Sequence, residues 1–428
     1  MRVSFRSLIY SIIYFLGVFF INSRVLKRRT ELKKTEFFSE VELNCLQTVK
    51  LRKLLTHAKT SCEYYSEILA KVDTENFNLD DLVTLPVLSK TTLRKNTNAL
   101  YSTAFCLDDL IESETSGSTG EAFIFYRDKD WDASHRAAIW RGLNQHNVQP
   151  WDRNLYLWGF FFDSKSILKM RFLDFFQNRF RLFQIDRDEI KANLNKIKGV
   201  KYVSGYSSVI DTLLRIVEDS NLSFPNIKLL KGTSEKIYSS YQKRAKRVLG
   251  ISIVSEYGAA ETGIIAFTCP EGENHTIREN VIVECLDGRA VITNLESFSL
   301  PIVRFELGDY IELVNQDCPC GRHPQIVKDV LGRVGASIVG RSKEYPSLTL
   351  YYIFKELALF HGVLLSYQGV QSEKGVLKLL IFDKLESNQY SLLMDVGKKY
   401  LPDLDLVIEQ GMMDDRKSKT IDFISTIV

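Results

Sequence analysis

Apolar residues recur along this chain with two periods, and together they predict alternating helices and strands. Residues 39–71 and 130–147 have apolar positions at helical spacing, whereas 154–162 and 227–230 are short apolar runs typical of strands. The segment 201–217 predicts a strand, a turn and a helix in that order. Strands that alternate with helices indicate an α/β protein with a largely parallel sheet.

The pattern changes after Gly332. It predicts a helix near 348–360, strands over 363–370 and 375–382, a helix over 388–400 and a last strand near 404–409. We therefore expect a large, multi-layered α/β domain of residues 30–332, followed by a small α+β domain of residues 333–428. Gly332 and Gly335 offer the backbone freedom that a hinge can use, so the small domain is expected to be mobile.

Residues 1–29 depart from this soluble pattern. Residues 8–21 are nearly all apolar, and basic residues stand on both sides: Arg2, Arg6, Arg24, Lys27, Arg28 and Arg29. The run is short for a full membrane span, and no small-residue cleavage site follows it. Three interpretations stay open: a helix docked on the protein's own surface, a helix lying in the cytoplasmic face of a membrane through its basic flank, and a true span or signal.

Composition narrows the class of protein. A net charge of +3 over 428 residues is too small to indicate a nucleic-acid partner, and we find no RNA- or DNA-binding signature. The seven cysteines are odd in number, whereas a secreted disulfide framework normally uses an even number. We therefore expect a protein of the reducing cytoplasm.

Six consecutive small residues form the most informative stretch: Thr115, Ser116, Gly117, Ser118, Thr119 and Gly120. Their hydroxyls, backbone N–H groups and two glycines allow a loop to wrap an anion such as phosphate. Residues 122–126 are rich in strand formers, so the loop is expected to join two strands. No Gly-Lys-Ser/Thr occurs, which excludes a Walker loop. By itself the hexapeptide also fits an ordinary surface turn.

Three later segments favour a functional role for the loop through their order and spacing: Ser255 to Glu261, Pro301 to Asp309, and Gly332-Arg333. Together with the loop they resemble the motifs of the adenylate-forming superfamily of acyl-CoA synthetases, peptide-synthetase adenylation domains and luciferases. Within it the chain is most similar to the phenylacetate-CoA ligase branch and its CapK-type relatives in capsule biosynthesis. The resemblance covers about residues 45–428.

The resemblance implies an ATP and Mg²⁺ site. The loop of residues 115–120 would bind phosphate, Ser234 and Glu235 the adenine edge, Tyr257-Gly258 the adenine face, Glu261 the Mg²⁺, Asp309 the ribose and Arg333 the nucleotide. Mg²⁺ prefers oxygen ligands and neutralises phosphate charge that would repel a carboxylate. Without the resemblance, Tyr257-Gly258 and Asp309 are interpreted as turn residues. The acidic residues that often follow Gly-Arg in the family are absent here, which leaves the hinge less well defined.

The family ends with a Gly-Lys pair whose lysine stabilises charge as a carboxylate attacks the α-phosphorus, and Ser418-Lys419 aligns with it. The resemblance thus implies Lys419, Thr119 and Glu261 as catalytic residues, with Lys417 as the second choice for the lysine. The alternative is a charged tail that is merely solvated.

Cys269, His275, Cys318 and Cys320 form a further candidate site, with His323 close by in sequence. Three thiolates and an imidazole suit a closed, structural Zn²⁺ site. The Cys-x-Cys spacing is tighter than usual, so chance clustering of reduced cysteines is the alternative. Some ligases of this branch carry a similar arrangement.

The expected activity is ATP-dependent conversion of a carboxylic acid to an acyl-adenylate with release of pyrophosphate, followed by acyl transfer to CoA. Transfer to a sugar or carrier in surface polysaccharide synthesis, and a non-catalytic nucleotide-binding scaffold at a membrane, are the alternatives. Trp158, Phe160, Phe161, Tyr206 and Ser207 are candidates for the acid pocket, but they do not specify the acid.

Overall fold

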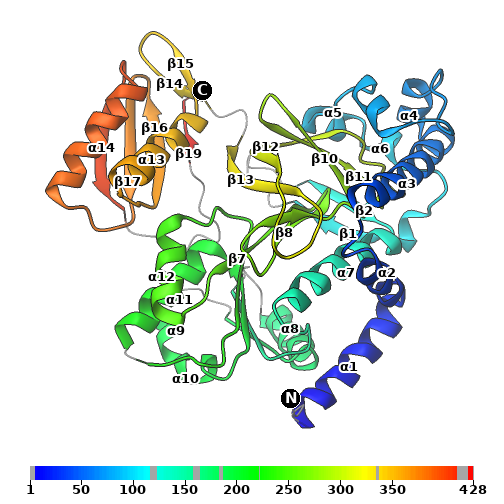
Figure 1. The fold of residues 1–428 in the computed structure, drawn as a ribbon, viewed down its shortest axis with the longest axis horizontal. Coiled ribbons are helices and arrows are strands. Elements are labelled where there is room, and N and C mark those ends of the chain that lie inside the picture. Colours follow the sequence, from blue (N-terminus) through cyan, green and yellow to red (C-terminus); the bar gives the residue numbers. More distant parts are fainter. Residues whose placement is uncertain are drawn as a thin grey trace. The chain divides into compact units, whose positions relative to one another are not determined.

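The computed structural model describes residues 5–115, 123–157, 164–182, 187–220, 222–333, 337–411 and 423–427. The chain divides into two compact units. Unit 1 comprises Met1–Asp152, Ser255–Leu307 and Glu312–Asp329, and unit 2 comprises Arg153–Val254, Gly308–Ile311 and Val330–Val428. Helices and strands occur in both units (Figure 1), which confirms the predicted α/β class.

Unit 1 begins with helices. They are α1 (Phe5–Asn22), α2 (Arg24–Lys34), α3 (Glu40–Ser61), α4 (Glu63–Ile68), α5 (Lys90–Lys95), α6 (Thr97–Leu100) and α7 (Lys129–Gln145), with short 3-10 helices at Leu79–Thr84 and Leu107–Asp109. Ser39 and Glu42 form a reciprocal capping box that begins α3. The helix predicted over 39–71 is present, but the extended backbone of Cys62 divides it into α3 and α4.

The strands that run mainly in unit 1 pair antiparallel. They are β1 (Ile111–Glu114), β2 (Ile124–Arg127), β7 (Ile253–Ala259), β8 (Gly263–Thr268), β9 (Asn274–Thr276), β10 (Val281–Leu286), β11 (Arg289–Asn294), β12 (Phe305–Asn315) and β13 (Gln325–Arg333). The pairs β1–β2, β7–β8, β8–β9 and β10–β11 are all antiparallel. The expectation of a largely parallel sheet is therefore wrong for this unit.

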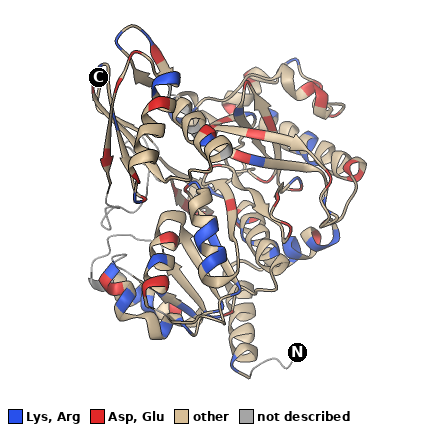
Figure 2. Ribbon diagram, turned by 60° about the vertical axis from the view of Figure 1, so that its left-hand side comes forward, with Lys and Arg blue, Asp and Glu red and all other residues tan. Residues whose placement is uncertain are grey.

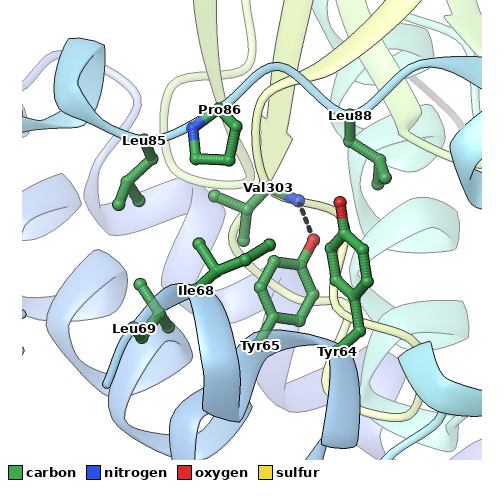
Figure 3. Close-up of a pocket in the computed structure, with 8 residues that line it drawn as sticks. All are labelled: Tyr64, Tyr65, Ile68, Leu69, Leu85, Pro86, Leu88 and Val303. Atoms are coloured by element: carbon green, nitrogen blue, oxygen red, sulfur yellow. Dashed lines mark hydrogen bonds between the residues drawn. The ribbon is translucent and has the colours of Figure 1, made fainter. Parts of the chain in front are cut away.

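Two helices of unit 1, α3 and α4, are fixed to segments that come more than 200 residues later. In α3, the Gln47 amide donates to the Val281 carbonyl at 2.9 Å, and in α4 the Tyr65 hydroxyl donates to the Pro301 carbonyl at 3.1 Å. The same hydroxyl accepts from the Val303 N–H at 3.3 Å, inside the apolar hollow shown in Figure 3. Leu88 forms a parallel bridge with Phe305. Unit 1 is thus built from distant parts of the sequence.

Unit 2 contains the parallel sheet that the sequence predicts. Its strands are β3 (Asn154–Leu157), β4 (Arg179–Arg181), β5 (Tyr202–Tyr206) and β6 (Leu229–Thr233), in the order β6-β5-β3-β4. Its helices before residue 255 are α8 (Ser164–Phe176), α9 (Arg187–Ala192), α10 (Leu194–Ile197), α11 (Ser207–Ser220) and α12 (Ser239–Leu249). α11 begins at Ser207, directly after β5, so the turn predicted between them is wrong.

The C-terminal part of unit 2 has its own four-stranded sheet, in the order β18-β17-β16-β19. Its elements are β14 (Ser337–Val339), β15 (Glu344–Pro346), α13 (Leu348–His361), β16 (Tyr367–Glu373), β17 (Val376–Ile381), α14 (Ser387–Tyr400), β18 (Asp405–Gln410) and β19 (Phe423–Ser425). The predicted helices and strands are present, and the β14–β15 hairpin and β19 were not foreseen. The domain boundary near Gly332 stays a prediction.

Candidate nucleotide site and Cys/His cluster

The small-residue loop connects the two strands of a hairpin, as the sequence predicts. β1 and β2 pair in a register that sets Glu114 opposite Ile124. The Thr115 N–H donates to the Phe123 carbonyl at 3.0 Å, and the Phe123 N–H donates to the Thr115 hydroxyl at 3.0 Å. Ser116, Gly117, Ser118, Thr119 and Gly120 lie outside the described residues, so their role in binding phosphate stays a prediction.

Tyr257 and Gly258 lie in β7, and Glu261 lies in the turn between β7 and β8. The strand register shifts between Tyr257 and Gly258. A Cβ atom on Gly258 would stand 2.3 Å from the Gly263 carbonyl oxygen, so only glycine fits there. The Glu261 side chain is nearly buried. A carboxylate at such a strand-to-turn junction has the donor type that Mg²⁺ prefers.

Ser234 and Glu235 follow β6, and Glu235 has a partner that the sequence did not reveal. Its carboxylate accepts from the Ser208 N–H at 2.9 Å, and its backbone carbonyl accepts from the Ser207 hydroxyl at 3.3 Å. Both serines belong to the first turn of α11, where a negative charge is favourable. Glu235 therefore stabilises the start of α11. Burial, together with the Glu235 charge, raises the pKa of Tyr206 to about 12.

Asp309 is nearly buried within β12, so its interpretation as a turn residue is wrong. The preceding Gly308 has φ +82°, which glycine adopts without strain and which explains the turn-like sequence. Arg333 ends β13. Lys417, Lys419, Trp158, Phe160 and Phe161 lie outside the described residues, so their roles stay predictions.

The nucleotide-site candidates are divided between the two units. Thr115, Tyr257, Gly258 and Glu261 belong to unit 1, whereas Ser234, Glu235, Asp309 and Arg333 belong to unit 2.

The four residues predicted to bind zinc converge within unit 1. Cys269 follows β8, His275 lies on β9, and Cys318 and Cys320 lie between β12 and β13. One ligand atom from each lies within 4.8 Å of all the others. The Cys269 and Cys318 sulfurs are 3.8 Å apart, and the Cys320 sulfur is 3.3 Å from His275 Nε2. A tetrahedron with Zn–S bonds of about 2.3 Å has S···S edges of about 3.8 Å, so the cluster has the dimensions of a zinc site.

Neighbouring groups orient these ligands. His275 Nδ1 donates to the His323 carbonyl at 2.8 Å, which leaves Nε2 with its lone pair toward the cluster. Burial raises the pKa of the Cys269 thiol, and it raises that of Cys318 to about 12. Although burial opposes it, hydrogen bonds from Arg322 and the nearby thiols lower the pKa of Cys320. The roles of Arg322 and the His323 carbonyl could not be predicted from the sequence.

The fold is that of the adenylate-forming ligases. The structure matches 2-hydroxyisobutyryl-CoA ligase in the postadenylation state, in complex with 2-HIB-AMP, with a TM-score of 0.70 over 92% of this chain and 91% of that chain. It matches an open conformation of the same ligase, with 2-HIB-AMP and CoA, with a TM-score of 0.62 over 92% and 93%. Sequence identity is 16% in both, so the likeness establishes the fold alone. The predicted fold class is confirmed.

Among curated proteins, the chain is similar to Protein CapK of Staphylococcus aureus. The two are 23% identical over an alignment of 319 positions, which covers 70% of this chain and 69% of CapK. The predicted resemblance to CapK-type proteins is thus confirmed at the level of sequence. No protein-family model matches the chain.

Proposed function

We propose that this protein is an AMP-forming ligase that activates a carboxylic acid. A carboxylate oxygen attacks the α-phosphorus of ATP, the bond from that phosphorus to the pyrophosphate oxygen breaks, and an acyl-adenylate and pyrophosphate form. An acceptor then takes the acyl group and AMP leaves. The supporting observation is the ligase fold over 92% of the chain, in which Glu261 lies in the turn after β7 and Ser234 and Glu235 directly follow β6.

The residues of this chain have separate tasks in that reaction. Thr119 and its neighbours bind phosphate oxygens, and Lys419 stabilises the charge that develops at the α-phosphorus. Glu261 would hold Mg²⁺, which would supply the neutralisation of phosphate charge. Tyr257, Ser234, Glu235, Asp309 and Arg333 position the nucleoside. Burial of Glu261 and Asp309 keeps water away from the contacts that they make.

We propose CoA as the acyl acceptor, because the ligase that this structure resembles is a CoA ligase. A sugar or carrier in surface polysaccharide synthesis is the second candidate, and the similarity to CapK favours it.

Purified protein should release pyrophosphate in the presence of ATP, Mg²⁺ and one member of a panel of carboxylic acids. Stimulation by CoA supports the first acceptor. Acid-dependent AMP formation that CoA leaves unchanged supports the second, and ATP binding without any pyrophosphate release supports a scaffold.

We also propose that Cys269, His275, Cys318 and Cys320 bind one structural Zn²⁺. The convergence of four ligands disfavours chance clustering, and a site closed by four protein ligands has no open position for catalysis. Such an ion would tie the β8–β9 hairpin to the connection between β12 and β13. Elemental analysis of the purified protein tests this, with one zinc per chain as the expected content.

The protein is proposed to act in the cytoplasm, held peripherally at the membrane by α1. Among the described residues, α1 is the one helix whose length and composition would allow it to cross a bilayer. One side of it packs on the protein: Tyr14 and Phe15 contact the rings of Trp140 and Trp151 at 5.3 to 5.7 Å. Its other side exposes Leu8, Ile12, Leu16, Phe19 and Phe20. Figure 2 shows that α1 has almost no charged residues. A helix docked in this way suits the membrane surface better than a span.

A further inference from the structure

α8 in unit 2 is a helix with its apolar side chains in solvent. Large exposed apolar residues lie along it from its fifth residue to its C-terminal end: Leu168 (72% exposed), Phe172 (65%), Leu173 (40%), Phe175 (62%) and Phe176 (41%). Leu168, Phe172, Phe175 and Phe176 follow the spacing i, i+4, i+7, i+8, which sets them on one face. The rings of Phe172 and Phe176 are 4.9 Å apart, so this face is a continuous apolar stripe.

A buried ion pair attaches α8 to the protein. Asp174 is buried, and its carboxylate accepts two hydrogen bonds from the Arg181 guanidinium, at 2.8 and 3.0 Å. Arg179 lies 3.7 Å from the same carboxylate, and both arginines stack on the Tyr156 ring. A surface helix of a globular protein normally buries its apolar face and exposes its polar one. α8 instead exposes a wide apolar stripe and buries Asp174, so its stripe does not serve the core of the protein.

Charge narrows the choice of partner. Lys169 and Arg171 are exposed beside the stripe, and Asp174, the one acidic residue of α8, is engaged with Arg181. The exposed face is therefore apolar and basic. A second copy of this face would bring cations against cations, whereas an anionic lipid surface offers both a negative potential and an apolar interior.

We propose that α8 inserts the stripe of Leu168, Phe172, Phe175 and Phe176 into an anionic lipid surface and is a second membrane contact of this protein. The contact lies in unit 2, separate from α1 in unit 1. It does not depend on the proposed reaction, because lipid binding can be measured without substrate or turnover. Insertion of the aromatic side chains into the lipid supplies the apolar part of the binding free energy. Lys169 and Arg171 supply the preference for negative headgroups.

The test uses full-length protein and vesicles of mixed phosphatidylglycerol and phosphatidylcholine. Phe172→Ser/Phe176→Ser should weaken flotation with these vesicles about tenfold, because two large apolar side chains no longer enter the lipid. Tyr390→Ser is the matched control, since Tyr390 is an exposed aromatic residue on another helix of unit 2, and it should bind as the parent does. Both variants should have the melting temperature of the parent, because the altered side chains are exposed. Equal vesicle binding by the double variant and the parent overturns the proposal.

Two further measurements distinguish lipid insertion by α8 from binding through α1 and from self-association. Phe172→Trp should show emission that brominated lipid quenches beyond the quenching of the parent, which reports insertion of α8 itself even while α1 is bound. Absence of extra quenching refutes insertion. Sedimentation velocity without lipid tests self-association. A parent dimer that Phe172→Ser/Phe176→Ser converts to monomer, with vesicle binding unchanged, would assign the stripe to an interface between copies and reject the lipid contact.

Discussion

The Cys/His cluster and the nucleotide-site residues are built in opposite ways. All four cluster residues belong to unit 1, and their ligand atoms converge within 4.8 Å. The nucleotide-site residues are divided between both units. A metal that stabilises a fold needs only local geometry, whereas adenylation needs groups that act on phosphate, ribose and adenine together. The two sites should therefore fail independently, and the following predictions test that independence.

The largest effect is expected for Glu261→Gln. The substitution keeps the size of this nearly buried side chain but removes the charge that would hold Mg²⁺. We expect acid-dependent pyrophosphate release to fall by about 10³-fold, as when a central electrostatic contact is removed. Zinc content and melting temperature should match those of the parent. Unchanged turnover would remove Glu261 from the active site.

Lys419→Ala should slow adenylation by about 10²- to 10³-fold with little change in ATP affinity, because the lysine stabilises the transition state more than bound ATP. Acyl transfer from preformed acyl-adenylate should proceed at close to the parent rate. Lys417→Ala is the matched control and should be near the parent in both steps. Slowing of both half-reactions by Lys419→Ala would indicate a structural role, and a defect in Lys417→Ala alone would move the assignment to Lys417.

Cys320→Ser tests whether damage to the Cys/His cluster leaves the nucleotide site unaffected. Loss of one thiolate should release zinc and lower the free energy of unfolding by about 2–3 kcal/mol, because metal binding energy is folding energy. The folded fraction should retain the KM of the parent for ATP. Zinc analysis, thermal melting and low-temperature kinetics measure these quantities. Cys285→Ser, which alters an exposed cysteine outside the cluster, should change none of them. Parent-like stability in Cys320→Ser would reject a structural metal.

Glu235→Gln asks whether one residue serves both stability and binding. Removal of the charge beside the Ser208 N–H should cost about 1 kcal/mol of stability, the usual value of a charge at a helix N-terminus. If Glu235→Gln also raises the KM for ATP at temperatures well below melting, this result supports the predicted role of Glu235 at the adenine edge. If only the melting temperature changes, Glu235 leaves the nucleotide site and remains a cap of α11.

The smallest of these effects is expected at low pH, where protonation of Asp403 should lower the stability of unit 2. Hydrogen bonds from the Tyr345 hydroxyl and the Ser342 N–H hold the pKa of Asp403 well below its usual range. Its contribution to stability is therefore fully present above the unfolded-state pKa of about 3.9 and is lost as pH falls toward the folded-state value. Asp403→Asn should flatten the acid side of the stability profile below about pH 5, measured by denaturant unfolding. An identical acid profile for parent and variant would contradict this.

Local sequence patterns predicted elements better than their pairing. The helical spacing of 130–147 and 388–400 located α7 and α14, because each depends on its own side chains. The antiparallel pairing of β9 with β13 and the place of Asp309 within β12 depend on partners elsewhere in the chain. α8 escaped prediction because its pattern lacks an ordinary buried face.

The candidate sites show the same limit. The four cluster residues could be named from the sequence because few residue types bind zinc, and the structure brings them together. The contact of Glu235 with α11 could not be predicted, since it arises only when β6 ends beside the start of that helix. The sequence identifies chemically distinctive groups, whereas the partners of common charged residues come from the fold.

The parallel bridge between Leu88 and Phe305 has a consequence for biosynthesis. The first helices of unit 1 emerge from the ribosome about 200 residues before the strands that complete their core. This high contact order means that unit 1 cannot finish folding until those strands have been synthesised, while the segment that forms the parallel sheet of unit 2 emerges in between. Until then α3 and α4 keep apolar side chains in water. We therefore expect the nascent chain to depend on holdase chaperones until residue 305 has left the exit tunnel.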